Sequence, residues 1–328
     1  MHLERDGELP AVKVEDVIDI ARAAGDVIMR VYSTDPETWE SRSKSDDTPV
    51  TKADVMADEL ICSRLRSAYP DIPIISEESE KLPYEERRDY DYCWVVDPLD
   101  GTKEFVKRTG DFAVMIGLCF HGKPVLGVVH APAQETPKTY YAASGQGAFV
   151  LEGGRELCGE GLGKSKRISA RTFGVRDSGL RLAVSSSRPP REFIASCGSP
   201  VTSSIGSAAL KAVAVADGTV DIFPCLYSTS EWDTCAPQVL VEEAGGVVLP
   251  WDGTEEVGMA DVAALLLLLR AENAPAAAAA SAESAATGGE ASVGKKASPT
   301  GSGELRRLSY NKADLSSPRC VFLGRCTT

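Results

Sequence analysis

The sequence has no apolar run long enough to cross a membrane and no excess of basic charge. Its longest apolar run, residues 262–269, is far shorter than the roughly 18 residues that a membrane span needs. Its 35 lysine and arginine residues are outnumbered by 48 acidic residues, which gives a formal charge of −13. A negative field of this size repels nucleic acid polymers and anionic membranes, so we expect neither as a partner. Any phosphate that binds must be held by local groups or metal ions.

Zinc-binding and disulfide patterns are also missing. The nine cysteines show no Cys-x-x-Cys spacing, so the sequence predicts neither a zinc site nor a disulfide framework. The first ten residues lack the apolar stretch of a signal peptide, and we expect a cytoplasmic enzyme, with an organellar location left open. A content of 43% hydrophobic and 25% charged residues excludes wholesale disorder and collagen-like repeats. We therefore expect a folded, soluble protein.

At 328 residues the chain is longer than one ordinary core, so we expect two domains or one large layered α/β body. Apolar residues three and four apart predict a helix over 11–32, and Thr51 with Asp54 forms the capping-box pattern of a second helix that ends before Pro70. Strand-like runs follow at residues 72–76, 92–96, 112–120, 125–130 and 139–150. This order predicts a multi-stranded sheet covered by helices.

The second half alternates strand and helix patterns, which predicts a smaller α/β layer. The expected elements are strands at 181–184 and 220–223 and helices at 207–216 and 234–244. Residues 255–304 have a low-complexity composition without apolar periodicity, so we expect a disordered insertion there. The expected divisions are an N-terminal tail (1–10), a larger α+β metal-binding domain (11–165) and a smaller α/β substrate domain (166–254 with 305–328).

The segment WVVDPLDGTKEF carries the strongest chemical signal. In it an apolar strand runs directly into two aspartates, Asp97 and Asp100. Pro98 cannot donate to a sheet ladder and Gly101 tolerates unusual backbone angles, so the chain can turn and bring both carboxylates and the Leu99 carbonyl to one place. Three such hard oxygens suit Mg²⁺. A strand-end turn with solvated aspartates is the alternative.

Two further segments place acidic residues at the ends of predicted elements. In IISEES, Glu77 and Glu78 follow a hydrophobic strand, and in EWDT, Asp233 stands at the start of a helix. The alternatives are a solvated loop for the glutamates and an N-cap role for Asp233, but the combination favours a shared carboxylate site. Cys93 and Cys235 lie close by in sequence. One interpretation is that these cysteines provide redox control. We favour the other, that they serve as small buried hydrophobic residues.

Four motifs, PVTKAD, SEES, DPLDGT and WDTCAP, occur in this order and are followed by Gly245-Gly246 and a terminal YNKADL. In this the chain resembles the lithium-sensitive, magnesium-dependent phosphomonoesterases, a family that includes inositol monophosphatase and 3'(2'),5'-bisphosphate nucleotidase. The resemblance covers residues 11–254 and 305–328 and implies a layered αβαβα sugar-phosphatase-like fold. DGTKEF and the YNK tail look like the bisphosphate nucleotidase branch, whereas inositol monophosphatases usually read DGTTNF.

The resemblance also implies a metal site and an activating pair. The implied ligands of two or three Mg²⁺ ions are Glu77, Asp97, the Leu99 carbonyl, Asp100 and Asp233. Asp54 and Thr102 are the implied activating pair for the attacking water, with Glu77 assisting. The backbone N–H groups of Gly101 and Thr102 are expected to receive phosphate oxygens if a helix starts there. For Asp54 the alternative is a capping role alone.

In its substrate segments the sequence departs from the family pattern. Bisphosphate nucleotidases often show SRSH, but here Ser187 is followed by Arg188 in the place of the histidine. The relatives' GSxLK reads GSAALK, which is one residue longer between Gly206 and Lys211. We expect Ser187, Arg188, Ser207 and Lys211 to bind substrate, because guanidinium and ammonium groups pair with phosphate oxygens. Surface cations on a solvated face are the alternative for the two basic residues.

These features favour a magnesium-dependent phosphoric monoester hydrolase. We expect a 3'(2'),5'-bisphosphate nucleotidase of sulfur metabolism that converts adenosine 3',5'-bisphosphate to AMP and phosphate. An inositol monophosphate or polyphosphate 1-phosphatase is the first alternative. The second is a phosphonucleotide-binding or scaffold protein of low activity, which the intact acidic motifs argue against. The physiological substrate, the oligomeric state, the number of metal ions and the role of the insertion stay open.

Overall fold

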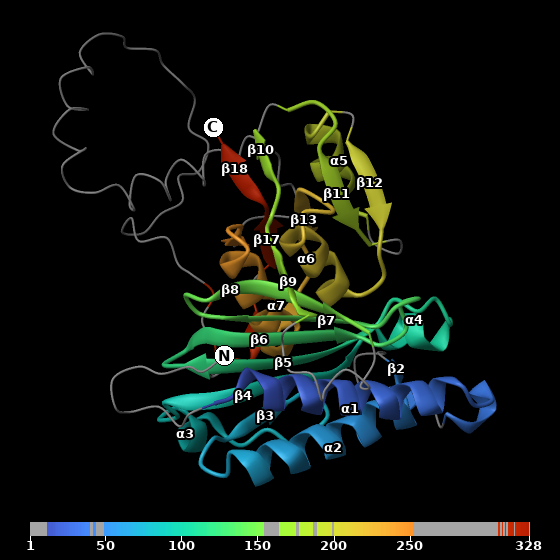
Figure 1. Cartoon of the computed structure of the whole chain (residues 1–328), viewed down its shortest axis with the longest axis vertical. Helices are drawn as coiled ribbons and strands as arrows, with labels where there is room; N and C mark the ends of the chain where they lie inside the picture. The colour runs from blue at the N-terminus through green and yellow to red at the C-terminus, as the bar shows by residue number, and fades with distance from the viewer. Residues whose placement is uncertain are drawn as a thin grey trace, which may run out of the picture.

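The computed structural model describes residues 12–39, 42–43, 49–153, 164–174, 177–185, 189–198, 200–251, 308, 310, 312, 314–317 and 319–327. The expected N-terminal tail (1–10) and insertion (255–304) lie outside these residues. Within the described part, helices and two large sheets alternate as layers (Figure 1). No helix among the described residues is long and apolar enough to cross a membrane.

Two long helices form the first layer. α1 (Val14–Tyr32) buries apolar residues at intervals of three and four along one side. α2 (Lys52–Ala68) begins after the N-cap Thr51, and the predicted capping box between Thr51 and Asp54 is formed. Both predicted helices are confirmed. Short elements lie between them: η1 (Pro36–Thr38), β1 (Arg42–Ser43) and β2 (Pro49–Val50).

The second layer is a seven-stranded sheet, with α1 and α2 against one face (Figure 1). Its order is β3 (Ile74–Ser76), β4 (Tyr92–Asp100), β5 (Ala113–Phe120), β6 (Lys123–Ala131), β7 (Lys138–Ala143), β8 (Gly147–Glu152) and β9 (Lys166–Ile168). β3 and β4 are parallel, and the other neighbours are antiparallel. The run 139–150, which we predicted as one strand, forms both β7 and β8, because the chain reverses at residues 144–146. Two short helices, α3 (Tyr84–Arg87) and α4 (Thr102–Val106), flank β4.

Helices α6 (Ala208–Ala216) and α7 (Glu231–Glu243) form the third layer, against the other face of this sheet. The predicted helix 207–216 is confirmed, with Ser207 as its N-cap. α7 begins three residues before the predicted 234–244, because Ser230 is its N-cap and Asp233 closes the capping box. The alternative that made Asp233 itself the N-cap is therefore wrong, since it occupies the third helical position.

A five-stranded sheet and α5 (Arg191–Ser196) complete the layers. The sheet order is β12 (Val201–Ser204), β11 (Arg181–Val184), β13 (Ile222–Cys225), β17 (Arg319–Leu323) and β15 (Val247–Trp251). The predicted αβαβα order is thus confirmed. β17, from the C-terminal part of the sequence, lies between β13 and β15 in this sheet. The remaining pairs are β10 (Thr172–Gly174) with β18 (Arg325–Thr327) and β14 (Thr229–Ser230) with β16 (Ser316–Ser317).

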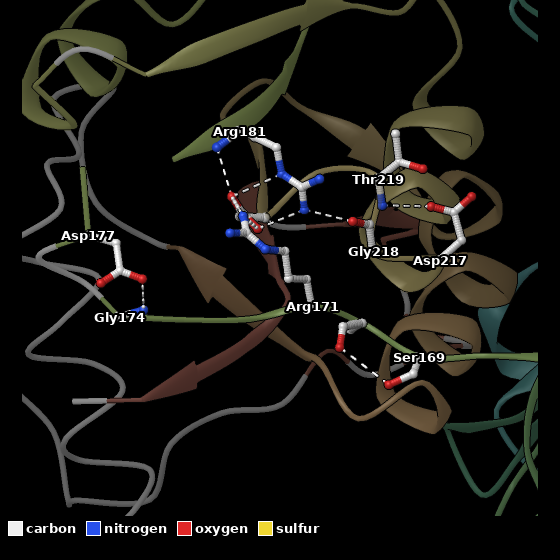
Figure 2. Close-up of polar contacts among 10 residues, drawn as sticks. Ser169, Arg171, Gly174, Asp177, Arg181, Asp217, Gly218 and Thr219 are labelled. Atoms are coloured by element: carbon white, nitrogen blue, oxygen red, sulfur yellow. Dashed lines mark hydrogen bonds and ion pairs between the residues drawn. The ribbon is translucent and has the colours of Figure 1, made fainter. Parts of the chain in front are cut away.

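A buried carboxylate ties together segments of this second sheet. Asp221, which is fully buried, accepts hydrogen bonds from Arg171 Nη1 at 3.0 and 3.1 Å and from the Arg181 N–H at 2.8 Å (Figure 2). A cavity of about 150 Å³ lies beside it, lined by Arg171, Phe173, Asp221 and residues 177–180. Because both guanidinium groups are paired with the buried carboxylate, we interpret this network as support for the sheet.

Helix α7 lies close to the seven-stranded sheet because two strand positions are glycines. A Cβ on Gly117 of β5 would lie 2.5 Å from Cys235 Sγ, and a Cβ on Gly127 of β6 would lie 2.4 Å from the Ala236 carbonyl oxygen. The two glycines are paired with each other across β5 and β6. A side chain at either position would push α7, and Asp233 with it, away from the sheet.

We expect Gly127→Ala to lower the free energy of unfolding by about 1 to 3 kcal/mol, because the added methyl group meets backbone atoms of α7. Gly117→Ala should lower the free energy of unfolding by less, since its methyl group meets mainly a side-chain sulfur. Cys235→Ala should therefore rescue Gly117→Ala but not Gly127→Ala in urea unfolding. Equal losses without rescue would contradict the packing of α7.

Candidate active site

Strand β4 ends in an irregular stretch that carries two of the predicted acids. Its ladder with β5 shifts register between Asp97 and Asp100, which marks a bulge. Pro98 has no N–H to donate to the ladder, and the Leu99 N–H donates instead to Asp97 Oδ1 at 2.9 Å. The predicted turn at this point of the sequence is confirmed.

Three aspartates meet where β4 and α7 adjoin. One carboxylate oxygen from each of Asp97, Asp100 and Asp233 lies within 4.8 Å of the other two. Asp233 comes from the first turn of α7, where its Oδ2 accepts a hydrogen bond of 2.6 Å from the Ser230 N–H. Two elements far apart in sequence thus bring their acids to one place.

The charges of these acids oppose one another in a buried place. Asp97 is 2% exposed, and its burial raises its pKa well above the usual range, with further contributions from the charges of Glu77, Asp100 and Asp233. Burial also raises the pKa of Asp100. Crowded buried carboxylates require protons or a cation. Because clustered hard oxygens are the ligands that divalent cations such as Mg²⁺ prefer, these residues fit a metal site.

The two other predicted ligands flank the aspartates. The Glu77 N–H donates to the Val96 carbonyl at 3.0 Å directly after β3. Its charge contributes to the raised pKa of Asp97, although its carboxylate is outside the group of described acids that lie within 4.8 Å of one another. The Leu99 carbonyl lies 3.3 Å from Thr102 Oγ1. The structure brings the three aspartates together, with the Leu99 carbonyl between two of them in sequence and the backbone of Glu77 against β4. The role of all five groups as metal ligands stays a prediction.

Asp54 joins α2 to the first residue of α4. Its Oδ2 accepts hydrogen bonds from the Thr51 N–H at 2.7 Å and from Thr51 Oγ1 at 2.6 Å, and its Oδ1 accepts one from Thr102 Oγ1 at 3.0 Å. Burial raises the pKa of Asp54 to about 6. The capping box is real, but capping alone does not account for Asp54, because its second oxygen contacts the predicted catalytic partner.

Gly101 makes the sharp turn from β4 into α4. Its φ of +94° lies in the left-handed region that favours glycine, and a Cβ there would lie 2.6 Å from the Asp111 carbonyl oxygen. A short helix does start at Thr102, which meets the condition set for phosphate binding at this turn. The expected contacts of the Gly101 and Thr102 N–H groups with phosphate stay predictions.

Ser207 contacts one of the three clustered aspartates directly. Its hydroxyl donates to Asp100 Oδ2, which also accepts a hydrogen bond of 2.8 Å from the Ala209 N–H. The N-terminal turn of α6 thereby fixes Asp100. The other two predicted substrate-binding residues of the second half, Ser187 and Arg188, lie outside the described residues.

Lys211 is almost completely buried, with 1% of its surface exposed. Its Nζ donates to the carbonyls of Ile205 at 3.1 Å and Gly206 at 2.8 Å, and it lies 5.3 Å from the centroid of the Phe223 ring. The alternative of a surface cation on a solvated face is therefore wrong for Lys211. Its contact with a substrate phosphate stays a prediction.

Two residues near the site were missed by sequence analysis. Asp58 lies one helical turn after Asp54 on α2, and its Oδ2 accepts a hydrogen bond of 2.8 Å from Ser79 Oγ. Lys81 places its ammonium 4.9 Å from the centroid of the Trp232 ring, next to Asp233 in sequence. Two signals for Asp58 were available in the sequence. Asp58 lies four residues after Asp54 on the same predicted helix, and the motif SEES has a serine at each end that can donate to a carboxylate.

The predicted YNK tail contacts the helix that carries Asp233. The Tyr310 hydroxyl donates to Gln238 Oε1 at 2.7 Å, and the Lys312 N–H donates to Glu231 Oε1 at 3.0 Å. Both acceptors belong to α7. Tyr310 also donates its N–H to the Gly122 carbonyl, between β5 and β6, at 3.1 Å, so the tail links α7 to the seven-stranded sheet.

Cys93 and Cys235 are both buried, and Cys235 Sγ lies 3.4 Å from Cys119 Sγ. Burial raises the pKa of the Cys235 thiol. Because the thiolate is the reactive form, these surroundings support the interpretation as small buried hydrophobic residues. Redox sensitivity stays untested.

Comparison with known proteins places the chain in a family. Residues 12–286 match the Inositol monophosphatase family, and the chain belongs to this family. Curated relatives include the 3'(2'),5'-bisphosphate nucleotidase CysQ of Salmonella typhimurium, which is 41% identical over 244 residues that cover 73% of this chain and 91% of the relative. CysQ of Escherichia coli K12 is 40% identical over 245 residues with the same two shares, 73% and 91%.

Solved structures agree with this placement. CysQ from Bacteroides thetaiotaomicron, a bacterial member of the inositol monophosphatase family, is 29% identical and has a TM-score of 0.67 over 94% of this chain and 96% of its own. An IMPase of Thermotoga maritima, also 29% identical, has a TM-score of 0.59 over 72% of this chain and 85% of its own. The resemblance found in the sequence motifs is confirmed.

Metal binding by the three aspartates predicts that Mg²⁺ stabilises the wild-type protein against unfolding. Asp97→Asn removes a charged ligand and also relieves repulsion, so without metal it should unfold at the wild-type temperature or slightly above it. In calorimetry, MgCl₂ should raise the unfolding temperature of the wild type and hardly affect Asp97→Asn. Asp177→Asn, outside the site, should respond like the wild type. An undiminished magnesium effect in Asp97→Asn would contradict the metal site.

Proposed function

We propose that the chain is a magnesium-dependent 3'(2'),5'-bisphosphate nucleotidase that hydrolyses adenosine 3',5'-bisphosphate to AMP and phosphate. The observation that carries the proposal is the convergence of Asp97, Asp100 and Asp233 within 4.8 Å beside the Asp54–Thr102 hydrogen bond. The choice of substrate is supported by the CysQ relatives, which are 36–41% identical to this chain and are named 3'(2'),5'-bisphosphate nucleotidases. A cytoplasmic location, lithium inhibition and a role in sulfur metabolism belong to the same proposal.

The metal would be held by the three aspartates, with Glu77 and the Leu99 carbonyl as further ligands. A phosphate monoester carries two negative charges near neutral pH, so its hydrolysis needs positive charge around the attacking and leaving oxygens. Bound Mg²⁺ supplies that charge. The carboxylates are held in place by neighbouring donors, for example Ser207 on Asp100, so little reorganisation is needed when cation and substrate arrive.

Thr102 and Asp54 would carry the proton of the attacking water. Thr102 Oγ1 donates to Asp54 Oδ1 at 3.0 Å, which leaves its oxygen able to accept a proton from water while its own proton passes to Asp54. The pKa of Asp54, raised by burial to about 6, suits a group that accepts a proton near neutral pH. Glu77 would assist, and the N–H groups of Gly101 and Thr102 would receive phosphate oxygens.

Loss of the Thr102 hydroxyl should interrupt this transfer. With adenosine 3',5'-bisphosphate and Mg²⁺, Thr102→Ala should lower kcat by roughly 10²- to 10⁴-fold, the usual size of an acid–base contribution. Thr102→Ser retains the hydroxyl and should retain most of the activity. Thr109→Ala removes a hydroxyl from the loop after α4 and serves as the control. Phosphate release measures all four proteins, and wild-type rates for Thr102→Ala would rule out the proton transfer.

Arg188 tests the class of substrate. If it holds the phosphate that is not cleaved, Arg188→Ala should lower kcat/KM for adenosine 3',5'-bisphosphate roughly ten- to hundred-fold, the effect of losing about 1.5 to 3 kcal/mol from a charged hydrogen bond. A substrate with a single phosphate should be turned over as before. Arg191→Ala, at the start of α5, is the matched control.

Two outcomes decide against the bisphosphate substrate. Equal losses of Arg188→Ala on both substrates would give Arg188 a structural role. A wild-type preference for inositol 1-phosphate would favour the inositol phosphatase alternative. Lys211→Ala adds a comparison: a loss confined to the bisphosphate supports phosphate binding, and an equal loss on both supports a role through the carbonyls of Ile205 and Gly206.

A further inference from the structure

Asp58 is a buried acid on α2 that the reaction described above does not use. It is 8% exposed and accepts hydrogen bonds from the hydroxyl of Ser76, from Ser79 Oγ at 2.8 Å and from Cys62 Sγ at 3.4 Å. Ser76 donates to Oδ1 and Ser79 to Oδ2, so both carboxylate oxygens are engaged. All three partners are donors, which is the arrangement that an ionised carboxylate requires.

The two serines bracket the segment that carries Glu77. Ser76 is the last residue of β3 and Ser79 follows three positions later, so their shared acceptor fixes the segment at both ends. Between them, the Glu77 N–H is held by the Val96 carbonyl at 3.0 Å, and the Glu77 carbonyl accepts a hydrogen bond from Lys81 Nζ. The backbone of Glu77 therefore has a single, well-determined direction.

α2 supports two parts of the site from one face. Asp54 and Asp58 are four residues apart in the helix, a spacing that places both side chains on the same side. Asp54 contacts Thr102 at the start of α4, and Asp58 contacts the serines after β3. The relative position of the hydroxyl of Thr102 and the carboxylate of Glu77 thus depends on one rigid turn of helix.

We infer that Asp58 is a positioning residue that holds the Glu77 segment in its metal-binding geometry. The inference rests on the proposed function, because it assumes that Glu77 is a metal ligand. Partners that orient a ligand matter because they remove the freedom that metal binding would otherwise have to restrict, and their loss typically costs 10- to 100-fold in metal affinity or activity.

Calorimetric titration of the substrate-free protein with MgCl₂ tests this without using turnover. Asp58→Asn keeps the size of the side chain but replaces one acceptor oxygen by a donor group, so the Mg²⁺ dissociation constant should rise about 10- to 100-fold. Ser79→Ala removes one of the two serine contacts and should give a smaller rise. Asp58→Ala combined with Ser79→Ala should weaken binding by less than the product of the single effects.

Cys62→Ala is the matched control. Cys62 is buried on the same helix, one turn after Asp58, and bonds to the same carboxylate. Its Sγ also lies 3.9 Å from Ser79 Oγ, a much longer contact than the 2.8 Å bond from Ser79 to Asp58, so its removal leaves both serine bonds to Asp58 in place. It should lower the unfolding temperature and leave the Mg²⁺ dissociation constant within about three-fold. If Asp58→Ala does not fold, Asp58→Asn and Ser79→Ala carry the test, since both are milder changes.

The outcomes separate this inference from the proposed function. Wild-type Mg²⁺ affinity in Asp58→Asn, or equal changes in Asp58→Asn and Cys62→Ala, would overturn the positioning role even if the wild type hydrolyses the bisphosphate. A selective loss of Mg²⁺ affinity would support it even if the wild type hydrolyses a different phosphate ester. At saturating Mg²⁺ the KM of Asp58→Asn for substrate should match that of the wild type, because the substrate contacts are untouched.

Discussion

The close approach of α7 to the seven-stranded sheet is the constraint on which the site depends. Asp97 and Asp100 end a strand, whereas Asp233 belongs to a helix more than a hundred residues later. Only the absence of side chains at Gly117 and Gly127 lets the helix come near enough for the three carboxylates to meet. The same helix receives the C-terminal tail through Glu231. The geometry of the three acids therefore depends on the packing of α7 against these two glycines.

The acids are held together against their own repulsion. Each has a neighbouring donor: the Leu99 N–H for Asp97, the Ala209 N–H for Asp100 and the Ser230 N–H for Asp233. These bonds fix positions, but burial still raises the pKa of Asp97 and Asp100, and the nearby negative charges raise it further. The fold thus keeps an electrostatic cost that a bound divalent cation would remove, and such binding would couple stability to the ligand.

Much of the site could be predicted from sequence because its residues occur in short motifs next to recognisable element ends. The capping pattern at Thr51 and the Pro-Gly signals around Asp97 depend on local chemistry, and the helices and strands that carry them followed from periodicity. What could not be predicted depends on distant partners. The role of Asp58 follows from its contacts with serines eighteen and more residues away. The burial of Lys211 depends on how α6 packs. The start of α7 was misplaced because Ser230 as N-cap and Asp233 as N-cap look alike in sequence.

The position of β17 has a consequence for how the chain folds during synthesis. This strand lies between β13 and β15, yet it is translated after both of them. The seven-stranded sheet with α1 and α2 can form while the ribosome is still working, but the second sheet has a gap in its interior until β17 emerges. Until then the facing edges of β13 and β15 lack their native partner. Such open edges pair readily with other chains, so the insertion of β17 removes an aggregation hazard as well as completing the sheet.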